Sequence, residues 1–206
     1  NEKDAAYIKL ADDLTFLHDN SFICSSEKDG FNHLYHYDKT GKLINQITKG
    51  NWEVTGFYGY NGQTKTVFYR STEDGSTNRS IYSIGITGNN KKKLSKNKGT
   101  NSAVFSSSFQ YYINTFSSTD RPFVYTLNDS STGEVIKEIK NNNALKAKTD
   151  LYRVPVKEIS VLKTKNGDFN MLMMKPNDFD PAKEYPLLMY QYSGPGSQSV
   201  SNTWYN

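Results

Sequence analysis

Short runs of alternating apolar and polar residues, separated by Gly, Asn and Asp, fill most of residues 14–140. Runs of this length and period predict β-strands. The pair Asp-Gly occurs at Asp29 and again at Asp74, 45 residues later, and Asp120 follows a third run at about the same distance. A strand is predicted before and after each of these turns, and one more short strand ends each unit. The predicted strands are residues 22–27, 33–37, 42–48, 67–73, 80–86, 91–95, 112–116, 123–127 and 134–139.

The repeated unit matches a β-propeller blade. Gly41, Gly88 and Gly133 lie in polar segments between predicted strands, where a tight β-turn favours a positive φ. A unit of about 45 residues with four short strands cannot bury both of its faces alone and must stack on neighbouring units. About three blades fit into residues 14–150, fewer than the four to eight of a closed ring. A β-sandwich also has short, regularly spaced strands, but it needs no 45-residue period.

The pattern changes after the third unit. Residues 143–148 form a polar patch that predicts a helical turn in a linker. Alternation over residues 156–175 predicts a β-hairpin, with Asn166 and Gly167 as its turn. The apolar run 187–192 predicts a strand buried in a larger sheet, because both of its faces are apolar.

Composition agrees with a mainly β fold and excludes several classes of function. Aromatic residues make up 14% of the 206 residues, and they suit pleated, half-buried surfaces. The net charge is only +4, and the densest basic run, Lys91 to Lys93 with Lys96 and Lys98, predicts a solvated hairpin tip and no nucleic-acid site. The one cysteine, Cys24, is expected to be a small buried residue. No apolar run approaches the roughly 20 residues that span a bilayer.

The residues alone do not reveal an active site. The sequence contains no G-x-S-x-G motif, the usual setting of a hydrolase serine. All three histidines, His18, His33 and His36, precede residue 40, and we interpret them as residues of strand surfaces or of the blade core. No His and carboxylate cluster has metal-ligand spacing, and no Gly-rich phosphate loop is present. We therefore predict no metal and no cofactor.

Three motifs resemble the dipeptidyl peptidase IV family of the prolyl oligopeptidase superfamily. Residues 48–54 match the family's T-K-G-x-W-E-V, which lies at a blade junction. Residues 179–188 match F-D-x-x-K-x-Y-P-L-L, and residues 192–198 match Y-x-G-P-x-S-Q. Residues 21–33 also resemble a late blade of the family's propeller. The motifs occur in the family's order, so the resemblance covers nearly the whole chain.

This resemblance implies an eight-bladed propeller that caps an α/β-hydrolase. Residues 1–150 are then expected to be the C-terminal blades, and residues 151–206 the N-terminal strands of the hydrolase domain. The implied activity is that of a serine exopeptidase, without metal or cofactor, that releases X-Pro or X-Ala dipeptides from peptide N-termini. Its partners are peptides with Pro or Ala at the second position. The resemblance also implies a secreted or periplasmic, cell-envelope location and leaves a homodimer of the full-length protein open.

Tyr192 is the one residue to which the resemblance assigns chemistry. In the family the tyrosine of Y-x-G-P donates its hydroxyl to the oxyanion hole, where charge develops on the carbonyl oxygen. The family's Ser, Asp and His follow this loop, so residues 1–206 are expected to lack the triad and to be inactive alone. The substrate-binding residues stay unknown, because the family's paired glutamates belong to earlier blades. Two alternatives remain: a non-enzymatic propeller binding module of the same family, and a prolyl tripeptidyl peptidase.

Overall fold

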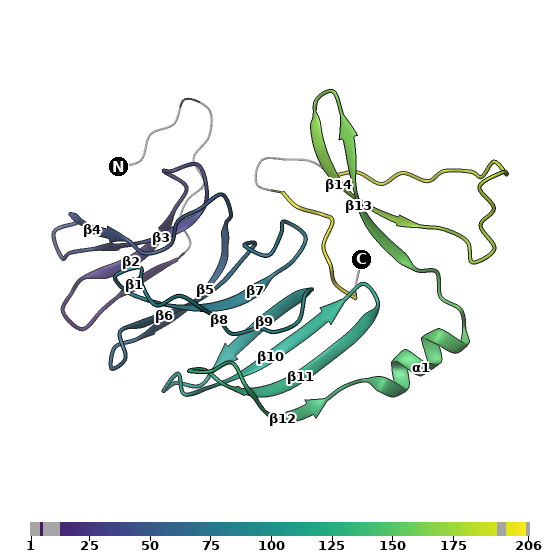
Figure 1. The fold of residues 1–206 in the computed structure, drawn as a ribbon. Coiled ribbons are helices and arrows are strands. Elements are labelled where there is room, and N and C mark those ends of the chain that lie inside the picture. The colour runs from purple at the N-terminus through teal and green to yellow at the C-terminus, as the bar shows by residue number, and fades with distance from the viewer. Residues whose placement is uncertain (1–4, 6–12, 193–196, 205–206) are drawn as a thin grey trace.

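Three four-stranded antiparallel sheets, one helix and one hairpin make up the fold (Figure 1). The computed structural model describes residues 5, 13–192 and 197–204. Within each sheet the strands pair in chain order, which is the topology of a propeller blade. The first blade is β1 (Leu14–Phe16), β2 (Phe22–Ser26), β3 (His33–Tyr37) and β4 (Leu43–Gln46); the second is β5 (Val54–Asn61), β6 (Thr66–Ser71), β7 (Ser80–Gly85) and β8 (Lys92–Lys93); the third is β9 (Thr100–Phe105), β10 (Tyr111–Ser118), β11 (Arg121–Asp129) and β12 (Val135–Lys140). The predicted mainly β class with three blades is confirmed.

The blade repeat reappears in the hydrogen bonds. In the first blade the backbone N–H of Leu34 donates to Thr48 Oγ1 at 2.9 Å. In the second blade the backbone N–H of Ile81 donates to Ser95 Oγ at 3.0 Å. In both blades the hydroxyl follows the fourth strand and the donor lies on the third strand. This bond satisfies a buried backbone donor at the same place in each unit.

The core lies between the blades. Along β6, Val67 and Tyr69 face the first blade, whereas Phe68 faces the third, because successive side chains of a strand point to opposite faces. All three are at most 3% exposed. The second blade therefore buries both faces of its sheet. By contrast, Phe16 of the first blade and Val104 of the third are 69% and 73% exposed on the outer faces of the stack.

Turn glycines support the contact between blades. Gly41, Gly88 and Gly133 have φ values of +84°, +84° and +79°, which confirms the turns predicted from the sequence. A Cβ atom on Gly133 would lie 2.5 Å from the carbonyl oxygen of Leu94, the residue that follows the last strand of the preceding blade. A Cβ atom on Gly41 would meet nothing within 4 Å. Gly133 is thus required both by its backbone conformation and by the neighbouring blade.

The predicted role of the histidines is confirmed for the two that lie on β3. His33 is fully buried, with its ring within 3.1 Å of Thr48 Oγ1 and edge-on to Trp52. Trp52 also stacks on Tyr69 of the second blade, so the T-K-G-x-W-E-V motif does lie at a blade junction. His36 is half-buried beside Ser21, whose hydroxyl lies 2.9 Å from Nε2.

One expectation about a side chain is wrong. Cys24 is half-buried, because its neighbours Ile23 and Ser25 occupy the inward positions of β2. The lysines of the basic run are exposed to solvent, as expected, but they also make a contact outside their own blade. Lys96 pairs with Glu134 of the third blade at 2.6 Å, so this run carries a contact between blades.

The segment after the third blade is partly as predicted. The linker patch is a longer helix, α1 (Asn143–Leu151), and no helix of the described chain is long and apolar enough to cross a bilayer. The hairpin is present as β13 (Lys157–Thr164) and β14 (Gly167–Met174). Its predicted Asn-Gly turn is wrong by one residue, because Thr164 pairs with Gly167 and the turn consists of Lys165 and Asn166. Gly167, with φ +126°, follows the turn and resumes the strand.

The predicted strand over residues 187–192 is not formed. Leu187, Leu188 and Tyr190 are 84%, 95% and 86% exposed, and no strand pairing includes them. A strand exists only where a neighbour accepts and donates its backbone hydrogen bonds. Within the described residues no other segment supplies that neighbour.

We predict that Gly133→Ala destabilises the fold more than Gly41→Ala. Both substitutions force alanine into the left-handed region, which costs about 1–2 kcal/mol. Gly133→Ala adds a collision with the Leu94 backbone, worth a further ~1–3 kcal/mol. Urea unfolding of both variants measures the difference. Equal losses of unfolding free energy would mean that the turn does not support the packing of the blades.

Candidate functional site

The chain after the hairpin returns to the blades, at the ends of the strands of the second and third blades (Figure 1, yellow). Asn202 makes the contact. Its backbone N–H donates to Thr77 O at 2.7 Å, and its carbonyl accepts from Thr100 Oγ1 at 2.9 Å. Its side-chain oxygen accepts the N–H of Thr119 at 3.0 Å, and its amide nitrogen donates to Asn78 Oδ1 at 3.0 Å. All four polar groups of Asn202 are therefore bonded to the propeller.

The two following residues extend this contact. The hydroxyl of Ser117, on β10, lies 2.9 Å from Thr203 Oγ1 and accepts the backbone N–H of Trp204 at 3.3 Å. Ser117 is fully buried. On the other side, Lys157 Nζ of β13 donates to Trp204 O at 2.6 Å, and burial lowers the pKa of this lysine. The segment thus lies between the propeller and the hairpin and bonds to both. We call Asn202, Thr203 and Trp204 the anchor segment.

The propeller side of the contact is held by the β6–β7 connection. The Asn78 amide donates to Asp74 O at 3.0 Å, which turns its oxygen toward Asn202. Burial alone would raise the pKa of Asp74, but hydrogen bonds from Lys93 and Ser80 outweigh it, and the pKa is lowered. The Asp74 carboxylate therefore stays charged and ties this connection to β7 and β8.

Arg79 also holds the β6–β7 connection in place. Its guanidinium donates to the carbonyl oxygens of Ser76 and Asn78, both at 2.8 Å. Burial lowers the pKa of Arg79, and the nearby Arg70 adds to that effect. The backbone of Arg79 also pairs with Thr100 at the start of the third blade. Arg79 thus fixes the backbone of the residues that bind Asn202.

Tyr192, the one candidate catalytic residue, lies on the exposed segment that leads to the anchor. Its side chain is 65% exposed, and its carbonyl lies 3.5 Å from Ser199 Oγ. The glycine and proline of its motif, Gly194 and Pro195, lie outside the described residues. Among the residues that the structure describes, none is bonded to the Tyr192 hydroxyl, and the role of Tyr192 in an oxyanion hole stays a prediction.

The second matched motif forms a turn of its own. Phe179 and Tyr185 stack with ring centroids 5.1 Å apart. The Tyr185 hydroxyl accepts the backbone N–H of Asp180 at 2.8 Å. These contacts give the segment before the apolar run a local structure of its own.

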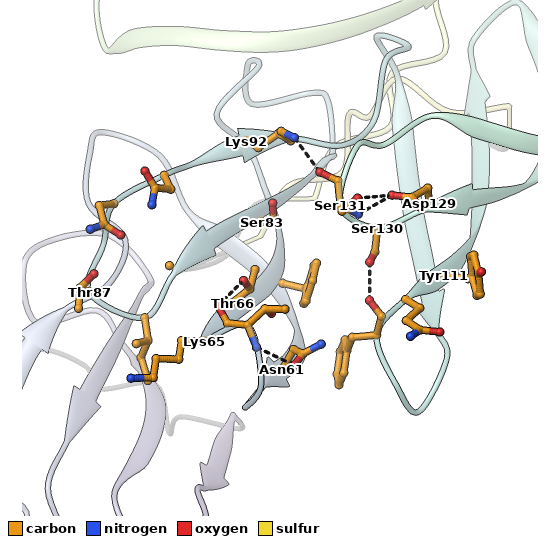
Figure 2. Close-up of a pocket in the computed structure, with 18 residues that line it drawn as sticks. Asn61, Lys65, Thr66, Ser83, Thr87, Lys92, Tyr111, Asp129, Ser130 and Ser131 are labelled. Atoms are coloured by element: carbon orange, nitrogen blue, oxygen red, sulfur yellow. Dashed lines mark hydrogen bonds between the residues drawn. The ribbon is translucent and has the colours of Figure 1, made fainter.

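A hollow of about 820 Å³ lies between the second and third blades, at the strand ends opposite to the anchor segment (Figure 2). The Asp129 carboxylate accepts the hydroxyl and the N–H of Ser131 at 2.6 and 2.8 Å, which lowers its pKa. Lys92 of the second blade donates to Ser131 O at 2.7 Å. The lining includes no histidine or cysteine. Its polar groups connect the two blades.

Comparisons with known proteins agree with a propeller segment. A family model described as "Dipeptidyl peptidase IV (DPP IV) N-terminal region" matches residues 1–123. The chain belongs to this family, as the motifs predicted. The crystal structure of Porphyromonas gingivalis dipeptidyl peptidase 4 superposes with a TM-score of 0.87 and 43% identity, over 92% of this chain and 27% of that one.

Fungal relatives give the same result. The chain is 32% identical over 188 residues to a dipeptidyl peptidase 4 of Arthroderma otae, and 30% identical over 186 residues to that of Trichophyton tonsurans. Each match covers 89% of this chain and 24% of the relative. The chain thus spans about a quarter of the length of the curated relatives that it matches.

The resemblance assigned a role to Tyr192, but nothing in the sequence pointed to the anchor segment. Asn202 is one of many Asn, Ser and Thr residues in a polar stretch, and no motif distinguishes it. Its partners lie 83 to 125 positions earlier in the chain, at Thr119, Thr100, Asn78 and Thr77. Only the stacking of two blades brings them together.

We predict that Arg79→Met lowers the free energy of unfolding by about 1–3 kcal/mol, because two carbonyls lose a charged donor. The substitution keeps most of the apolar stem. Arg121→Met is the matched control, since Arg121 donates to an exposed Asn143 side chain at 2.8 Å and should cost under about 1 kcal/mol. Chemical denaturation measures both. Similar losses would contradict a special role for Arg79.

Proposed function

We propose that this chain is a segment of a dipeptidyl peptidase IV-like serine exopeptidase that releases X-Pro or X-Ala dipeptides from peptide N-termini. The superposition on the Porphyromonas gingivalis dipeptidyl peptidase 4 over 92% of the chain is the observation that carries this proposal. The substrates would be peptides with Pro or Ala at the second position, and the location secreted or periplasmic. The family's catalytic Ser, Asp and His would lie in the part of the protein beyond these residues.

The domain division that goes with this function places the propeller blades in residues 1–150 and the start of the hydrolase domain in residues 151–206. The end of the four-strand repeat at β12 supports this division. So does α1, which ends at Leu151 and separates the blades from the hairpin. The anchor segment would then be a contact between the two domains.

Tyr192 would act in acyl transfer as an oxyanion donor. Attack on the scissile carbonyl places negative charge on its oxygen, and a phenol O–H held near that oxygen stabilises the charge. Stabilisation confined to the transition state would appear in kcat.

We predict that the full-length gene product reacts with a fluorophosphonate probe and cleaves Gly-Pro-p-nitroanilide. The probe forms a covalent bond only with an activated serine, and the substrate tests the release of an X-Pro dipeptide. Residues 1–206 expressed alone are the control and should not react, because they contain no G-x-S-x-G motif.

The opposite outcomes are informative. A full-length product that neither reacts with the probe nor cleaves the substrate would be a non-enzymatic binding relative. Cleavage of tripeptide but not dipeptide substrates would identify a tripeptidyl peptidase. Either result would contradict the proposed function.

We predict that Tyr192→Phe in the full-length protein lowers kcat by roughly 10² to 10³, the usual cost of one oxyanion donor. Tyr190→Phe is the matched control, since Tyr190 is an exposed tyrosine two residues earlier on the same segment. Steady-state kinetics with the dipeptide substrate measure both variants. Unchanged turnover of Tyr192→Phe would reject its role.

A further inference from the structure

We propose that the anchor segment, Asn202 to Trp204, is a positioning device that sets the place of Tyr192 relative to the propeller. The inference rests on the proposed function, in which Tyr192 meets the substrate. It adds residues to the machinery that no motif assigns: Asn202 and Thr203 on one side, and Ser117 and Asn78 on the other.

The hydrogen bonds of Asn202 determine its orientation completely. Two bonds are made by its backbone and two by its side-chain amide, and all four have lengths of 2.7–3.0 Å. The amide accepts from Thr119 and donates to Asn78, so an end-for-end flip would place like groups together. An arrangement this specific is more than a loop resting on a surface.

The contact spans two blades at once. Thr77 and Asn78 belong to the β6–β7 connection of the second blade. Thr100 begins β9 of the third blade, and Thr119 lies in the β10–β11 turn of the same blade. Any change in the packing of these two blades would therefore move Asn202.

The anchor segment lies close to Tyr192 along the folded chain. Ser199 Oγ donates to the carbonyl of Tyr192 at 3.5 Å, which places Ser199 beside the backbone of Tyr192. Only three residues separate Ser199 from Thr203, whose hydroxyl meets the buried Ser117. Lys157 of β13 also donates to Trp204 O, which joins the anchor segment to the hairpin. Because the connection from Ser199 to Thr203 is short, we expect a displacement of the anchor segment to displace Tyr192 as well.

Displacement of a catalytic group by about 1 Å can cost about 10²-fold in rate. We therefore expect Ser117→Ala and Asn202→Ala in the full-length protein to lower kcat by about ten- to a hundredfold. The KM for a dipeptide substrate should change less than about threefold, because substrate binding is not lost. Neither residue touches the substrate in this role, so each is a positioning residue.

Ser130→Ala is the matched control for Ser117→Ala. Ser130 is also a buried serine of the third blade, 5% exposed, and its hydroxyl donates to Phe109 O. It lies at the opposite ends of the strands, beside the hollow in Figure 2. A merely structural effect of losing a buried hydroxyl would be similar in both variants. Positioning of Tyr192 requires that kcat falls in Ser117→Ala and stays within about twofold in Ser130→Ala.

Hydrogen exchange measures the docking of the anchor segment independently of catalytic activity. Hydrogen exchange in the full-length protein should show protected amides at Asn202 and Trp204, because both N–H groups donate to the propeller. Ser117→Ala should raise exchange at Trp204, and Ser130→Ala should not. Thr203→Val should act with Ser117→Ala non-additively on kcat, as expected of one contact.

The kcat and hydrogen-exchange results together distinguish a failure of this inference from a failure of the proposed function. Faster exchange at Trp204 with unchanged kcat would overturn the positioning role. A fall in kcat without faster exchange would overturn the anchor as its cause. A wild-type product without peptidase activity would overturn the proposed function and, with it, positioning for catalysis, whereas the exchange data would still decide whether the segment docks.

Discussion

The burial of both faces of the second blade is the constraint on which the rest of this structure depends. β6 places Val67 and Tyr69 toward one neighbour and Phe68 toward the other, and none of the three is more than 3% exposed. A sheet that is apolar on both sides loses most of its hydrophobic stabilisation unless a blade covers each side. The stack of blades, and not a single blade, is therefore the folding unit.

Stacking also determines where the polar turns lie. Because every blade is a meander in the same direction, its turns alternate between the two edges of the stack. One edge gathers the β6–β7 and β10–β11 connections that receive Asn202. The other gathers the turns that line the hollow, where Lys92 and Ser131 join two blades. The two edges thus differ in chemistry although the blades share one pattern.

The contact made by the anchor segment shows how a segment distant in sequence is fixed without apolar packing. Asn78 and Ser117 are almost fully buried, and a buried polar group without a partner is costly. Docking of Asn202 and Thr203 gives these two buried groups hydrogen-bond partners, and the propeller in turn gives partners to the polar groups of the anchor segment. Such a contact is specific in geometry, and it makes the position of Tyr192 dependent on the blades.

The sequence by itself determined the local features: the repeat, the turns at Gly41, Gly88 and Gly133, the hairpin and the family. The repeat, the turns and the hairpin follow from periodicity and backbone preference, which act over a few residues, whereas the family was inferred from the resemblance of three motifs. The strand predicted over residues 187–192 is not formed, because an apolar run becomes a strand only where a second strand pairs with it. The sequence also gave no sign that Asn202 binds the propeller. Only the tertiary structure decided that contact, since its partners come from two blades whose turns meet when both faces of one sheet are buried.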